Sequence, residues 1–169
     1  MIKLMVKPTR FAPHVCVACT ILALLGIGLG FWRSSPLIMV VFLLPAAIYE
    51  AYRTEGRSTK AASLLLLVVL VAEIFLIFFN IDFNLAEFLG TDQQYIGGYL
   101  VPLGDVKVVG PAIMAVLSVI LFVRTRGIYT RWLAVVILIT SFAIIYSLDP
   151  AIFQVFLRLA VGEGLKRVY

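Results

Sequence analysis

Residues 61–81 read AASLLLLVVLVAEIFLIFFNI, and this stretch decides the fold. Glu73 is the one charged residue in it. An α-helix rises about 1.5 Å per residue, so roughly 17–25 apolar residues cross a hydrocarbon core about 30 Å thick. The stretch is long enough to cross, and it predicts a transmembrane helix.

Four more stretches have the length and apolar character of spans. They cover residues 13–32, 36–52, 108–123 and 132–148. Over the 169 residues, 63% are hydrophobic and 14% are charged, and the mean hydropathy is +1.09. A soluble domain has about 45–50% apolar and about 25% charged residues, so a lipid bilayer must solvate the surplus. The sequence predicts an all-α integral membrane protein with about five transmembrane helices, in one transmembrane domain over residues 1–169.

The cations between the spans predict the orientation. They form three groups: Lys3, Lys7 and Arg10; Arg53, Arg57 and Lys60; and Arg124, Arg126 and Arg131. Five crossings place all three groups on one side, and the positive-inside rule makes that side cytoplasmic. We therefore expect a cytoplasmic N-terminus and an external or periplasmic C-terminus in a prokaryotic inner membrane. The net charge of +5 lies in short runs and predicts no nucleic-acid partner.

Two segments outside the spans are too apolar to stay solvated. The external loop over residues 82–107 carries Tyr95 and Tyr99, and we expect it to lie on the bilayer or to contact a partner subunit. In the tail, Asp149-Pro150 predicts a helix start and Gly162 a stop. Residues 151–161 then form a helix of about 16 Å, too short to cross. We predict an interfacial amphipathic helix, whose candidate partner-docking residues are Phe153, Phe156 and Arg158.

Glu73 is the most informative single residue. An acidic side chain at mid-helix costs about 2.5–3.5 kcal/mol, so it must face protein or a wet cavity. Asn80 lies seven residues further on and, in a regular helix, about 20° away on the same face. The pair is either an ion or proton site, or an inter-helix polar contact to Ser118, Thr140 or another subunit. Glu50, near Arg53, is predicted to be an interfacial charge.

Two small motifs have structural interpretations. Cys16 and Cys19 share a helix face that His14 cannot join, and no further His or Cys completes a zinc site, so we predict no metal. The thiols are expected to be small apolar core groups. Gly26 and Gly30 form a GxxxG motif, which indicates close packing against the second span or another chain.

Three functional classes remain. The favoured one is a non-catalytic subunit that packs within a respiratory, photosynthetic or transport assembly and stabilises it, with other membrane subunits as partners. The alternative is a small transporter subunit in which Glu73 couples an ion or a proton. An enzyme using Cys16 and Cys19 ranks last. No cofactor is predicted, and the sequence leaves a bound lipid, quinone or pigment open because such ligands bind through apolar contacts.

Overall fold

The computed structural model describes residues 11–81, 94–96, 99–101, 106–150 and 152–154. Five helices in this part of the chain are long and apolar enough to span a membrane. They are α1 (Ala12–Arg33), α2 (Pro36–Arg53), α3 (Arg57–Phe78), α5 (Val106–Arg124) and α6 (Ile128–Leu148). The predicted helical membrane fold with five spans is confirmed.

The helix ends follow from local chemistry. Pro36 begins α2, where its missing N–H has no helical partner to lose. The third span differs most from its prediction, because it covers Arg57–Phe78 and not residues 61–81. Hydropathy marks where a segment enters hydrocarbon, whereas the helix itself begins earlier among polar residues that also form helices readily.

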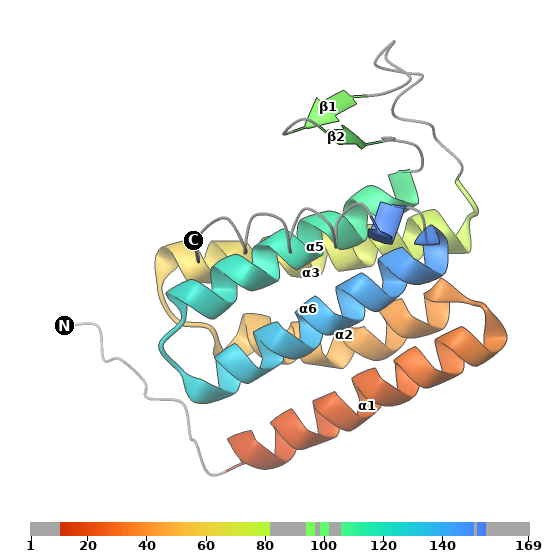
Figure 1. The fold of residues 1–169 in the computed structure, drawn as a ribbon. Coiled ribbons are helices and arrows are strands. Elements are labelled where there is room, and N and C mark those ends of the chain that lie inside the picture. The colour runs from red at the N-terminus through yellow and green to blue at the C-terminus, as the bar shows by residue number, and fades with distance from the viewer. Residues whose placement is uncertain (1–10, 82–93, 97–98, 102–105, 151, 155–169) are drawn as a thin grey trace, which may run out of the picture.

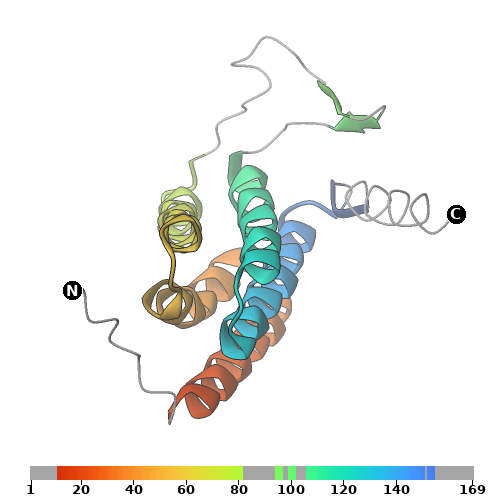
Figure 2. The same ribbon diagram turned by 90° about the vertical axis from the view of Figure 1, so that its left-hand side faces the viewer.

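Successive helices run antiparallel (Figure 1), and three of the four connections, α1–α2, α2–α3 and α5–α6, are short. Around the bundle, α1 packs on α2, α2 on α3, α3 on α5, α5 on α6, and α6 on α1. A further contact joins α2 to α6 across the middle. Figure 2 shows α1 and α3 on opposite sides of the bundle.

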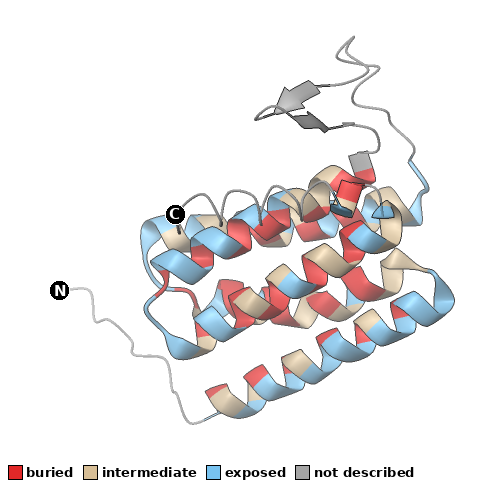
Figure 3. Ribbon diagram, viewed as in Figure 1, coloured by how far each residue is buried: buried red, intermediate tan, exposed pale blue. Residues whose placement is uncertain are grey.

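The core lies between the facing sides of all five helices. Its fully buried large side chains include Met39, Leu43, Leu66, Leu70, Met114, Leu121, Leu133, Ile137 and Ile144. The outward sides are also apolar, and Figure 3 shows exposed residues along α1 in particular. An apolar outer surface is the expected one for a bundle dissolved in lipid.

A short β-hairpin lies between α3 and α5, where we predicted only a loop. Strand β1 (Gln94–Ile96) pairs antiparallel with β2 (Tyr99–Val101), with Tyr95 opposite Leu100. The signal that predicts it is the Gly97-Gly98 pair between two short apolar runs, which is typical of a two-residue turn. Tyr95 and Tyr99 thus belong to paired strands, and a docking role for their side chains stays a prediction.

The tail begins as the sequence predicts. The backbone N–H of Ile152 donates to Asp149 Oδ1 at 3.2 Å, and that of Phe153 donates to the Asp149 carbonyl at 3.2 Å. Asp149 therefore caps a helical turn that includes residues 152–154. Phe156 and Arg158, and with them most of the predicted interfacial helix, lie outside the described residues.

Candidate functional site

Glu73 lies deep in the bundle, on the side of α3 that faces α5. Its side chain is 1% exposed. The carboxyl group stands against Gly110 of α5, so closely that a Cβ atom at position 110 would overlap Oε2 and lie 3.0 Å from Cδ. The missing side chain of Gly110 therefore provides the space for the carboxyl group.

The part of α5 beside Glu73 also has an interrupted hydrogen-bond ladder. Pro111 lies inside α5 and carries no backbone N–H, so it cannot donate to the carbonyl one turn earlier in the helix. An enclosed carboxyl group next to such a break is able to accept a proton or to contact a small cation. This is the strongest chemical site between the described helices.

Asn80 does not continue the helical stripe that we predicted with Glu73, because α3 ends at Phe78. Asn80 has φ +47° and its N–H donates to the Ile77 carbonyl at 3.2 Å, while the next N–H, that of Ile81, donates to the Leu76 carbonyl at 3.0 Å. These two bonds form the Schellman motif that ends many helices. The predicted angle of about 20° from Glu73 assumed a regular helix and does not apply.

The Asn80 side chain nevertheless takes part in a polar contact between α3 and α5. Lys107 Nζ donates to Asn80 Oδ1 at 2.9 Å, and Lys107 is only 8% exposed. The bond connects the end of α3 to the first turn of α5. Sequence reasoning missed Lys107, because a pair 27 residues apart leaves no periodic signal.

The hydroxyl groups proposed as partners of Glu73 bond to their own helices. Ser118 Oγ donates to the Ala115 carbonyl at 2.7 Å, and Thr140 Oγ1 donates to the Val136 carbonyl at 2.8 Å. Ser141 does the same with Ile137, at 2.8 Å. These three buried hydroxyls therefore donate to carbonyls of their own helices.

Glu50 is a second buried carboxyl group, and our prediction of an interfacial charge was wrong. It is 0% exposed, near the C-terminal end of α2. Thr54 Oγ1 lies 3.1 Å from Oε1, whereas Oε2 has no hydrogen-bond partner among the residues that the structure describes. Arg53 extends over the Tyr129 ring, with Cζ 5.3 Å from its centroid. Closeness to a helix end did not imply exposure, because α2 packs against α1, α3 and α6.

The thiol groups and the glycines have the neighbours expected of packing residues. Cys16 and Cys19 are free and buried, and His14 is exposed on the other side of α1. Within the described ranges no group of three or more His, Cys, Asp or Glu side chains is placed to hold a metal ion. A Cβ at Gly26 would overlap Phe42, and one at Gly30 would overlap Met39, so α2 is the helix that approaches both glycines.

Phe153, a predicted docking residue, packs on its own chain. Its ring lies 5.3 Å from that of Tyr146 and 6.2 Å from that of Phe142, both in edge-to-face geometry. Ile152 beside it is buried against Val108 and Ile145. The first turn of the tail is therefore held on the outside of α5 and α6, and Phe153 is only partly available to another protein.

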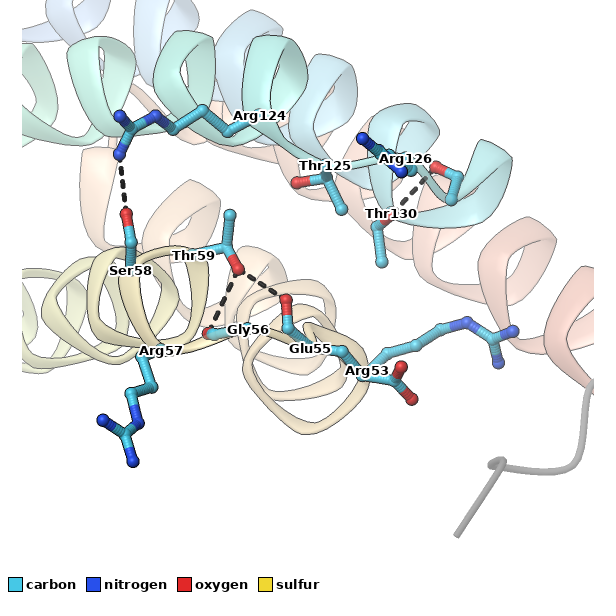
Figure 4. A pocket seen from close by; sticks show the side chains of 11 residues that line it. Arg53, Glu55, Gly56, Arg57, Ser58, Thr59, Arg124, Thr125, Arg126 and Thr130 are labelled. Carbon is cyan, nitrogen blue, oxygen red and sulfur yellow. Dashed lines mark hydrogen bonds between the residues drawn. The ribbon is translucent and has the colours of Figure 1, made fainter. Parts of the chain in front are cut away.

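A pocket at the opposite end of the bundle from Asn80 has four arginines among its lining residues, whose guanidinium groups point in different directions, and we name it the arginine pocket. Its volume is about 740 Å³, and it is lined by Arg53, Glu55, Gly56, Arg57, Ser58, Thr59, Arg124, Thr125, Arg126, Gly127 and Thr130 (Figure 4). It lies between the α2–α3 connection and the α5–α6 connection. Sequence analysis placed these arginines on one side of the membrane but not in one pocket.

Comparison of the chain with protein-family models, with curated proteins and with solved structures gives no match.

Proposed function

We propose that the chain is a non-catalytic integral membrane subunit that packs within a larger membrane complex and stabilises it. The observation that carries this proposal is a cluster of exposed phenylalanines at the end of α3, which we name the phenylalanine patch: Phe75, Phe78 and Phe79. They are 55%, 67% and 61% exposed. Phe75 stacks on Phe79 with ring centroids 6.1 Å apart, and Phe78 meets Phe79 edge-on at 5.3 Å.

The enrichment of aromatic residues at the membrane surface does not account for this patch. Tryptophan and tyrosine are enriched at membrane interfaces because their rings carry a polar atom that stays wet. Phenylalanine has no such atom. Aromatic side chains, phenylalanine among them, are instead enriched in the buried cores of protein interfaces. The patch therefore supports contact with another membrane subunit.

The buried hydroxyl groups support the same proposal. Ser118, Thr140 and Ser141 donate to carbonyls of their own helices. A pathway for a polar substrate needs side chains that present donors and acceptors to a lumen. These residues favour a packing role over transport.

Photo-crosslinking in native membranes tests the subunit proposal. Benzoylphenylalanine replaces Phe78 in one variant and Leu24, an exposed side chain of α1, in the matched control. We expect one discrete protein adduct at position 78 and none at position 24. Equal adducts at both positions, or a monodisperse monomer without companions after purification in mild detergent, would contradict the proposal.

A second candidate function is ion or proton coupling through Glu73. The specific observation in its favour is the enclosed carboxyl group against Gly110 and beside Pro111. Glu50 adds a second buried carboxyl about 20 Å further along the bundle axis, as helix rise implies. A proton relay needs several titratable groups in series, and two buried carboxyl groups at different depths meet this requirement better than Glu73 alone.

Proteoliposomes test this candidate. A potassium diffusion potential is imposed, and proton entry is followed with a trapped pH-sensitive dye. Coupling through Glu73 predicts entry with the native chain, loss of entry with Glu73→Gln, and unchanged entry with Glu55→Gln, which alters an exposed loop carboxylate. Equal entry in the native chain and Glu73→Gln would remove the candidate.

A further inference from the structure

The arginine pocket has the charge of an anion site. Four of its lining residues, Arg53, Arg57, Arg124 and Arg126, carry guanidinium groups, and Glu55 is the one acidic residue among the lining residues. Arg124 Nη1 donates to Ser58 Oγ at 2.6 Å, which holds that side chain between α5 and α3 (Figure 4). Guanidinium groups bind phosphate through paired, charge-assisted hydrogen bonds.

Two helix N-termini add to this charge. Gly56 is the N-cap of α3 and Gly127 is the N-cap of α6, both line the pocket, and neither helix has a side-chain cap. The first N–H groups of a helix lack intrahelical partners, and the helix dipole favours an anion beside them. Arg57, Ser58 and Thr59 of the first turn of α3 line the same pocket.

The position of the pocket indicates which anion it binds. About one turn after the polar first turn of α3, Leu64 and Leu65 are exposed, and Val123 of α5, just before Arg124, is 69% exposed. Exposed apolar side chains of this kind require hydrocarbon, so the pocket lies where hydrocarbon gives way to headgroups. A ligand there has its charge at the arginines and its apolar part beside the helices.

We propose that the arginine pocket binds the anionic headgroup of a phospholipid from the leaflet at this end of the bundle. A volume of about 740 Å³ exceeds what a bare phosphate needs and suits a headgroup with its glycerol. Basic pockets between transmembrane helices are known to bind such headgroups. The lipid would contact both the α2–α3 and the α5–α6 connection, which are far apart in the sequence, and would hold them together. This role is independent of any partner subunit and of Glu73.

Native mass spectrometry of the purified, delipidated full chain tests the proposal. Dioleoylphosphatidylglycerol is titrated into the native chain, into Arg124→Ala/Arg126→Ala, and into Lys60→Ala. Lys60 is exposed at the same end but does not line the pocket. We expect the lipid dissociation constant to rise about tenfold in the double variant, as loss of a charge-assisted bond implies, and to stay within about twofold in Lys60→Ala.

Two further arms separate the sources of the anion. Dioleoylphosphatidylcholine, which carries a phosphate but no net charge, should bind more weakly than phosphatidylglycerol and should not distinguish the variants. Inorganic phosphate that binds as tightly as phosphatidylglycerol would overturn the lipid assignment in favour of a soluble anion. Equal phosphatidylglycerol binding by the native chain and the double variant would overturn the site itself.

Circular dichroism and size exclusion establish that the double variant is folded. If it aggregates, the single variant Arg126→Gln replaces it, because Arg126 is exposed on the α5–α6 connection and supports no core packing. A smaller rise in the phosphatidylglycerol dissociation constant is then expected, because Arg124 remains, and an unchanged constant counts against the pocket in the same way.

Discussion

The carboxyl group of Glu73 and the missing side chain of Gly110 depend on each other. The first occupies the space that the second leaves in α5. Either residue alone has an ordinary explanation, since glycine allows transmembrane helices to approach closely and a buried acid needs only enclosure. Together they indicate that α3 and α5 pack around a carboxyl group.

Gly110→Ala should destabilise the protein by about 1–2 kcal/mol, because the new methyl overlaps the Glu73 carboxyl group. In a Glu73→Ala background the same substitution should be neutral or slightly stabilising, since alanine forms helices better than glycine. Thermal unfolding of the four proteins in detergent measures the coupling between the two sites. Additive effects would show that the two residues do not share this space.

The packing of α1 on α2 depends on glycines whose neighbours differ in stiffness. At Gly26 a Cβ meets Phe42 Cβ, which is attached directly to the backbone and cannot move aside. At Gly30 it meets the flexible chain of Met39, and at Gly28 nothing lies within 4 Å. The three positions therefore form an internal comparison within one helix.

We expect Gly26→Ala to destabilise most, by about 2–3 kcal/mol, because the interface must separate. Gly30→Ala should cost about 1 kcal/mol, since a methionine side chain adapts. Gly28→Ala should be neutral within about 0.5 kcal/mol. Unfolding in mixed detergent micelles ranks the three, and a large effect at Gly28 would mean that another chain packs there.

The end of α3 depends on a left-handed residue. Asn80 tolerates φ +47° better than a branched side chain does. Asn80→Val should therefore destabilise by about 1–2 kcal/mol, as left-handed backbone costs for such residues. Asn80→Gly retains the backbone geometry and removes the side-chain contacts, the Lys107 bond among them, so thermal unfolding should show a smaller loss than in Asn80→Val. Equal losses in the two variants would mean that the side-chain contacts dominate and the left-handed backbone contributes little.

At the scale of the whole molecule, the charges and the number of spans predict which end of the bundle is cytoplasmic and which is external. In a background where the buried Cys16 and Cys19 are replaced by alanine, Ser35→Cys should react with an impermeant maleimide added outside intact cells. Ser58→Cys, beside the arginine pocket, should react only after permeabilisation. The positive-inside rule makes this prediction, and reversed labelling would contradict the orientation.

Some features of the structure could be predicted from the sequence and others could not. The spans and their number were predictable because each span depends only on the length of one apolar segment. The Asp149 cap was predictable because it depends only on one side chain and the helical turn that follows it. Asn80 was misplaced because the prediction extended a regular helix past its Schellman end. Glu50 was misplaced because exposure at a helix end depends on the neighbouring helix.

The sequence by itself determined that hydrocarbon is the solvent of this chain, since crossing a bilayer is a property of each segment taken alone. Only the tertiary structure decided which residues meet: Glu73 with Gly110, Asn80 with Lys107, and the arginines of two connections around one pocket. These contacts join positions far apart in the chain. They depend on which faces of the helices pack together, and residue spacing along the chain does not record that choice.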